Sequence, residues 1–149
     1  MKNLLKKMKN REGFTLAELL IVVAIIAVLV AISIPIFSAQ LEKSRDAVSV
    51  ANLRTAYAQA QTLVLTGNNG ETSGDATLTI DTSSTDAYYS VAVTGVALKG
   101  KKDTDNWSGL ASELPFKDAL GDESGKDGDG KTVTFTYDKD GVIKKVTVA

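Results

Sequence analysis

The sequence contains neither cysteine nor histidine, and it has two prolines in 149 residues. Without cysteine the chain can form no disulfide and has no thiol nucleophile, and without histidine it has no imidazole base. Zinc sites of ordinary ligation are excluded by the same two absences. The sequence also shows no nucleophile elbow and no phosphate-binding glycine loop. We therefore expect no enzymatic activity and no bound cofactor or metal, and any globular part must hold together by packing.

Charge is unevenly distributed along the chain. The first twelve residues carry five basic side chains and Glu12, a net charge of +4, whereas the whole chain has a net charge of −1. The remainder is therefore acidic, with a net charge of −5. An acidic globular part repels phosphate groups, so we expect it to bind no nucleic acid.

A long apolar segment follows the basic leader. From Leu19 to Leu41 no residue is charged, and about 20 such residues in a helix span a bilayer core. Its aliphatic residues cover the whole helical circumference, which predicts burial in lipid or among other helices. Pro35 cannot donate a hydrogen bond to Ala31, so a kink is expected there. An ordinary secretory signal fits poorly, because the segment is long, begins with Glu18 and lacks an Ala-x-Ala cleavage site.

Beyond Pro35 the helical pattern continues with one apolar face. Periodicity predicts a single helix from about Thr15 to about Thr66, ended by the turn residues 67–70. The expected buried stripe is Val50, Leu53, Tyr57, Ala60 and Val64. The charged and polar residues expected on the other, exposed faces are Glu42, Lys43, Arg45, Asp46, Arg54 and Gln61.

The remaining residues predict a small antiparallel sheet. Strands are expected at Ala76–Ile80, Tyr88–Val96, Thr132–Tyr137 and Val142–Val148. Asp140-Gly141 between the last two is a strong hairpin signal. Residues 107–120 should be irregular or briefly helical, with apolar anchors at Trp107, Leu110, Leu114, Phe116 and Leu120. The predicted fold class is α+β: the second half of a long N-terminal helix packs on an antiparallel sheet of three or four strands.

Two polar segments are candidate binding sites. Residues 121–130 form a predicted acidic loop, and Asp127-Gly-Asp129 begins like a calcium loop, but Lys131 stands where a third oxygen ligand is required. The acidic residues that could still converge on Ca²⁺ are Asp118, Asp122, Glu123, Asp127 and Asp129. Residues 99–102 are a basic turn that a polyanion could contact. A solvated loop is the simpler interpretation of both segments.

The junction at Gly13 resembles a known signal. The order is a basic leader, Gly13, Phe14, Glu18 four residues later, the apolar segment and Pro35. This order closely resembles the class III signal of type IV pilins and pseudopilins. The resemblance covers about the first 65 residues, including residues 52–56, which are similar to pilin stalks. The globular part matches only in architecture.

The resemblance implies a processing scheme. A membrane aspartyl prepilin peptidase and N-methyltransferase would cut after Gly13 and methylate Phe14, whose new α-amine has a reference pKa of about 8. Glu18 would attract that amine on a neighbouring subunit and set the axial register of assembly. Residues 1–13 would then be a removed leader, 14–38 a transmembrane and filament-core helix, and 39–149 a globular head containing helix 39–66 and sheet 76–149.

The function implied is that of a structural subunit of a type IV pilus, a homo-oligomeric filament that supports adhesion, motility or aggregation. The chain would be a single-pass prepilin in the cytoplasmic (inner) membrane, with its N-terminus in the cytoplasm, and then part of an extracellular surface filament. Implied partners are membrane lipid, the assembly platform with its ATPase, and minor pilins. The alternatives are a pseudopilin of type II secretion or DNA uptake, and a monomeric membrane-anchored binding module that displays turn 99–102.

Two departures from the family pattern affect these expectations. Ala27 stands where many relatives have glycine, eight residues before Pro35, so a shorter segment of the helix is expected to loosen in a filament. Many pilins also close the head with a C-terminal disulfide, which a chain without cysteine cannot form.

Overall fold

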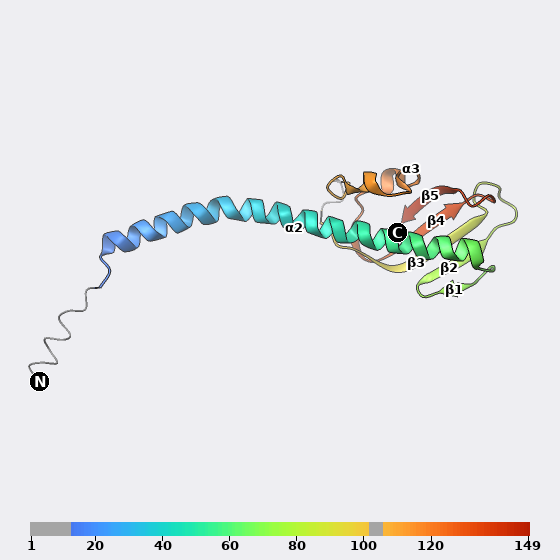
Figure 1. Ribbon diagram of the computed structural model, residues 1–149, viewed down its shortest axis with the longest axis horizontal. Coiled ribbons are helices and arrows are strands. Elements are labelled where there is room, and N and C mark those ends of the chain that lie inside the picture. The colour runs from blue at the N-terminus through green and yellow to red at the C-terminus, as the bar shows by residue number, and fades with distance from the viewer. Residues whose placement is uncertain (1–12, 102–105) are drawn as a thin grey trace, which may run out of the picture. The chain divides into compact units, whose positions relative to one another are not determined.

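The computed structural model describes residues 13–101 and 106–149. The chain divides into two compact units, residues 1–39 and residues 40–149. A single helix, α2 (Leu16–Thr66), contributes its first part to one unit and its second part to the other (Figure 1). The long helix predicted from about Thr15 to Thr66 is confirmed.

The first part of α2 is exposed on every face. All residues from 13 to 41 are exposed, and they include a run of aliphatic side chains from Leu19 to Ile36. Within the described residues, one helix has the length and apolar composition needed to cross a membrane, and it is α2. Residues on both sides of Pro35 belong to the same helix. The kink expected at Pro35 stays a prediction. The nearby Ser33 and Ser38 hydroxyls donate hydrogen bonds to the carbonyls of Leu29 (2.7 Å) and Ile34 (2.9 Å). Both hydroxyl groups therefore have an acceptor within the helix.

The second unit contains a five-stranded antiparallel sheet in the order β1-β2-β3-β4-β5. Its strands are β1 (Thr72–Ser73), β2 (Ala76–Ile80), β3 (Tyr89–Leu98), β4 (Gly128–Tyr137) and β5 (Ile143–Val148). Each strand pairs with its neighbour in sequence, through short connections except between β3 and β4, where residues 99–127 intervene. The prediction of three or four strands missed β1, whose two residues are too few to show an alternating pattern.

The β4–β5 hairpin forms where the Asp-Gly signal predicts it. Asp138 accepts a hydrogen bond from the Val142 backbone N–H through Oδ1 (2.9 Å), and the Asp138 N–H donates to the Val142 carbonyl (2.9 Å). Gly141 has φ of 79°, a left-handed conformation that glycine adopts without steric cost. Local turn chemistry thus determines the register of the last two strands.

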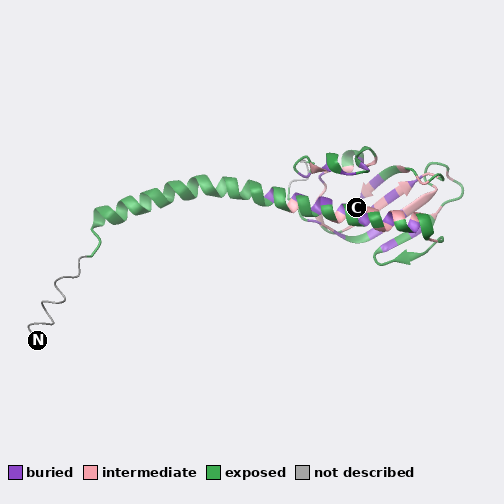
Figure 2. Ribbon diagram, viewed as in Figure 1, coloured by how far each residue is buried: buried purple, intermediate pink, exposed green. Residues whose placement is uncertain are grey.

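The core lies between the second part of α2 and the sheet. Figure 2 shows buried residues along this part of the helix and in the strands. Leu53 and Ala60 are fully buried, and the ring of Tyr57 lies 4.9 Å from Phe116 and 5.8 Å from Phe135 between centroids. Val50 is also buried, whereas Tyr57 and Val64 are partly buried. The predicted stripe is therefore confirmed as the packing face, and Ala56 and Leu63 belong to it as well.

Residues 106–127 cover part of the core with short helical turns. These are η1 (Leu110–Glu113), α3 (Lys117–Leu120) and η2 (Gly121–Glu123). The predicted anchors Trp107, Leu114, Phe116 and Leu120 are buried, and Leu110 is partly buried. Part of the interval 121–130 predicted as a loop is ordered secondary structure, because η2 begins at Gly121 and β4 already begins at Gly128.

Candidate functional site

The predicted cleavage junction lies just before α2. Gly13 and Phe14 are outside the helix, and Phe14 is 91% exposed. Gly13 does not adopt a positive φ, and a Cβ atom added to it would meet no heavy atom within 4 Å. Neither backbone conformation nor packing within the described chain therefore requires glycine at this position. The basic leader that precedes it, residues 1–12, lies outside the described residues.

Thr15 and Glu18 form a reciprocal pair at the start of α2. The Thr15 backbone N–H donates to Glu18 Oε2 (2.9 Å), and the Glu18 backbone N–H donates to Thr15 Oγ1 (3.2 Å). This is a capping box, in which two N–H groups that the helix itself cannot satisfy obtain acceptors. The helix consequently begins at Leu16.

Glu18 is exposed in the first turn of an otherwise uncharged stretch. It is the single charged residue between positions 16 and 41, and its negative charge is favoured by the dipole at the helix start. Glu18 forms no ion pair with any residue in 13–101 or 106–149, and its assembly role stays a prediction. The surrounding aliphatic surface is of the kind that soluble monomers do not display.

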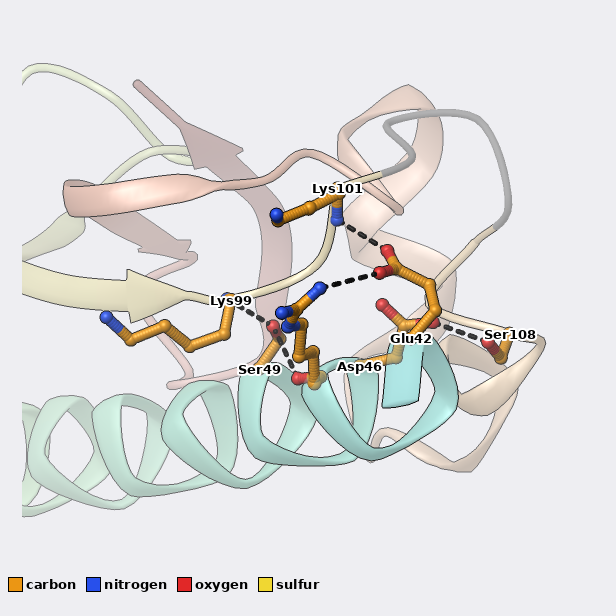
Figure 3. Close-up of polar contacts among 7 residues, drawn as sticks. Glu42, Asp46, Ser49, Lys99, Lys101 and Ser108 are labelled. Carbon is orange, nitrogen blue, oxygen red and sulfur yellow. Dashed lines mark hydrogen bonds and ion pairs between the residues drawn. The ribbon is translucent and has the colours of Figure 1, made fainter. Parts of the chain in front are cut away.

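A second polar cluster lies near the start of the globular unit (Figure 3). Glu42 Oε1 accepts a hydrogen bond from the Lys101 backbone N–H (2.5 Å), and Glu42 Oε2 lies 3.7 Å from the Arg45 guanidinium. Ser49 Oγ accepts from the Lys99 backbone N–H (2.7 Å). Asp46 accepts a hydrogen bond from the Ser108 hydroxyl. These contacts hold the segment that follows β3 against α2.

The prediction that Glu42 and Asp46 lie on exposed faces is wrong. Glu42 is 8% exposed and Asp46 is fully buried, because both carboxylates accept hydrogen bonds from the segment after β3. The spacing carried a signal that could have revealed this: positions 42, 46 and 49 continue the buried stripe of Leu53, Ala56, Ala60 and Leu63 in steps of three and four.

The segment held by this cluster has an unusual backbone. Asn106, Trp107 and Ser108 have φ of 53°, 48° and 55°, in the left-handed region that side chains disfavour. Trp107 is fully buried and its Nε1–H donates to Asp127 Oδ1 (3.0 Å), while Ser108 contacts Asp46. Burial and hydrogen bonding offset the local conformational cost.

The positions of the carboxylate groups show where a metal ion could be held. The acidic residues of 118–130 do not gather into one cluster of described residues: Asp129 pairs with Lys99 (2.5 Å), and Glu123 pairs with Lys126 (2.8 Å). Glu42, Asp46 and Asp127 do offer oxygens that lie within 4.8 Å of one another. These three carboxylates already accept hydrogen bonds, from Lys101, Trp107 and Ser108. We therefore describe it as a structural cluster.

The predicted basic turn at 99–102 is only partly described. Lys99 is paired with Asp129, so its charge is compensated, and Lys101 is exposed. Lys102 lies outside the described residues.

Comparison with known proteins identifies a family motif in the residues around the predicted cleavage junction and the start of α2. Residues 8–34 match the family described as the prokaryotic N-terminal methylation motif. Over 71 residues the chain is 45% identical to the type IV wide pilus major component PilA4 of Thermus thermophilus, a match that spans 48% of this chain and only about half (53%) of that protein. No solved structure matches the chain significantly.

Two relatives extend the similarity to the globular unit. Two fimbrial proteins of Pseudomonas aeruginosa are each 33% identical over 144 residues, which covers 91% of this chain and 84% of theirs. The same chain has the methylation motif, the exposed apolar helix and the antiparallel sheet packed on the second half of that helix. The chain therefore belongs to the type IV pilin family, whose members are structural fimbrial subunits and not enzymes.

Proposed function

We propose that this chain is the precursor of a type IV pilus subunit that is cut between Gly13 and Phe14. Hydrolysis of that bond leaves a carboxylate on Gly13 and an α-amine on Phe14, and the amine is then N-methylated. The observation that best supports the cut is the freedom of Gly13, which no packing contact or positive φ within the described chain explains. Glycine at this position lets a peptidase approach the backbone closely. Phe14 is exposed beside it.

The apolar half of α2 changes its surroundings between two stages. Before assembly it anchors the precursor in the cytoplasmic membrane, with the basic leader on the cytoplasmic side. After the cut it packs with the same helix of other copies in the core of an extracellular filament. Exposure of residues 13–41 on all faces supports both stages, because such a surface requires lipid or other helices around it.

Glu18 pairs with the Phe14 amine of a neighbouring copy. Among apolar helices a carboxylate without a partner is strongly disfavoured, so a subunit docked in the wrong register is penalised. Glu18 thus acts on register and docking more than on net stability. The kink or loosening at Pro35 would help α2 adapt to its neighbours during packing.

Partners follow from this scheme and from the family. They are further copies of the chain, a prepilin peptidase with N-methyltransferase activity, an assembly platform with its ATPase, and minor pilins. The acidic heads would form the outer surface that supports adhesion, motility or aggregation. The names of the similar proteins, a pilus component and two fimbrial proteins, favour a pilus over a pseudopilin of secretion or DNA uptake.

Intact-mass measurement of the protein from its native host tests the proposal. We expect sheared surface filaments to contain a chain that begins at Phe14 and has one added methyl group. The variant Gly13→Val should remain uncut, and its head should unfold at the wild-type temperature because a side chain at position 13 meets nothing in the fold. Filament protein that still begins at Met1, or that is cut near Ser33, would refute the processing scheme.

A further inference from the structure

The two oxygens of the Glu18 carboxylate have different surroundings. Oε2 accepts the Thr15 backbone N–H, whereas Oε1 accepts no hydrogen bond from any residue in 13–101 or 106–149. An ionised carboxylate can accept about four hydrogen bonds, so the capping contact leaves acceptor capacity on Glu18. A second donor can therefore bind Glu18 while the capping box stays intact.

We propose that Thr15 is a positioning residue for filament assembly: its capping box holds the Glu18 carboxylate so that Oε1 is presented to the Phe14 amine of the next copy. This inference rests on the proposed function, because it assumes that Glu18 pairs with that amine. Thr15 itself makes no contact with the incoming amine. It acts on Glu18 through the Thr15 N–H and the Thr15 Oγ1.

The physical reason is preorganisation. Glu18 has a long, exposed side chain that samples many rotamers, and binding the amine would normally require it to lose that freedom. In the capping box the Glu18 rotamer is already selected by the 2.9 Å hydrogen bond from the Thr15 N–H to Oε2. The 3.2 Å hydrogen bond from the Glu18 N–H to Thr15 Oγ1 holds the first helical turn, which keeps that donor and the Glu18 side chain together. Association then loses less conformational entropy, and the carboxylate has a defined position along the helix axis. A defined position is what a register-setting contact needs.

Two substitutions separate the charge of Glu18 from its position. Glu18→Gln removes the charge but keeps an acceptor oxygen at a position where capping boxes accept glutamine as well as glutamate. Thr15→Val keeps the shape of the side chain and the backbone N–H, but it removes the hydroxyl that accepts the Glu18 N–H, so the turn that keeps the carboxylate at that N–H loses one of its two hydrogen bonds. Thr15→Ser keeps the hydroxyl. Thr62→Val is the matched control, because Thr62 is an exposed residue in the second part of the same helix, where its hydroxyl donates to the Ala58 carbonyl (3.0 Å), and it lies far along the chain from Glu18.

The experiment expresses full-length variants in the native host and measures filament yield per cut chain, with cleavage followed by intact mass. We expect Thr15→Val to reduce this yield roughly fivefold, the size of a lost helix N-cap. Thr15→Ser and Thr62→Val should stay near the wild-type yield. Normalising to cut chains keeps the comparison valid even if Thr15→Val slows the cut.

A double variant distinguishes positioning from simple capping of the helix. If Thr15 acts through the Glu18 charge, adding Thr15→Val to Glu18→Gln should cause no further loss of yield. An equal fivefold loss in both backgrounds would overturn the inference, because Thr15 would then only stabilise the helix start. Normal yield from Thr15→Val alone would also overturn it while leaving the Glu18 pairing intact. Normal yield from Glu18→Gln would refute the pairing itself, and this inference with it.

Discussion

The last strand depends on one carboxylate, and this dependence gives a quantitative prediction. Glu123 Oε2 accepts the Val148 backbone N–H (2.6 Å) and the Lys126 ammonium (2.8 Å), and it is the side-chain contact that holds the end of β5. Val148 is buried, so an apolar side chain in place of Glu123 would cover its N–H without offering it an acceptor. A buried N–H left without an acceptor costs about 1–3 kcal/mol.

We expect Glu123→Leu to lower the free energy of unfolding by about 2–3 kcal/mol, since both the acceptor and the ion pair are lost. Glu123→Gln keeps an acceptor oxygen for Val148 and loses the charge, so its effect should be about 1 kcal/mol. For a head of about 110 residues, Glu123→Leu should lower the melting temperature by roughly 10 °C.

The assay is thermal unfolding of the full-length chain in detergent micelles, followed by tryptophan fluorescence. Trp107 is the sole tryptophan and is fully buried in the head, so its signal reports on the head and not on the apolar helix. The matched control is Asp122→Asn, which removes a neighbouring charge that is exposed. Wild-type stability in Glu123→Leu would refute the assigned role of the carboxylate.

The pH dependence of Glu123→Gln gives a second test. Burial by itself would raise the pKa of Glu123, but the Lys126 and Val148 hydrogen bonds and the charges of Lys126 and Lys145 outweigh it, so the pKa lies below its usual value. A lowered native pKa means that the charged form adds stability above the unfolded-state pKa of about 4.3. This stability is lost as the pH falls through the native pKa. The difference in free energy of unfolding between wild type and Glu123→Gln should therefore be largest at neutral pH and should become smaller below a pH of about 4. A difference that does not change with pH would contradict this linkage.

Two further substitutions test the interior of the head. Tyr137 is fully buried and its hydroxyl has no hydrogen-bond partner among the described residues. Tyr137→Phe should therefore leave the free energy of unfolding in urea unchanged or raise it by up to about 1 kcal/mol. A clear loss of stability would show that the hydroxyl has a hydrogen-bond partner after all. Burial also raises the pKa of Tyr137, so ultraviolet titration should show its phenol ionising above the usual range. Ser49→Ala removes the acceptor of the Lys99 backbone N–H and should cost about 1–3 kcal/mol, whereas the exposed control Ser44→Ala should change little; equal effects would argue against the Ser49 contact.

The sequence by itself determined the features that depend on neighbouring residues. The bounds of α2 follow from an unbroken helical period ended by turn residues at 67–70, and the β4–β5 hairpin follows from Asp140-Gly141. Threonine followed three residues later by glutamate, as at Thr15 and Glu18, is a local capping signature, so the sequence also contains a signal for the start of the helix. The processing junction is a local pattern too, which is why the family could be identified from the first residues of the chain.

Tertiary structure decided which charged residues are buried. The buried Glu42 accepts from Lys101, 59 residues away, and the buried Asp46 accepts from Ser108, 62 residues away. The partly buried Glu123 accepts from Val148, 25 residues away. A carboxylate can be buried only where distant donors converge on it, and no local pattern specifies that convergence. Helical spacing placed Glu42 and Asp46 in line with the core stripe, but only the fold supplied the donors that allow charged residues to occupy it.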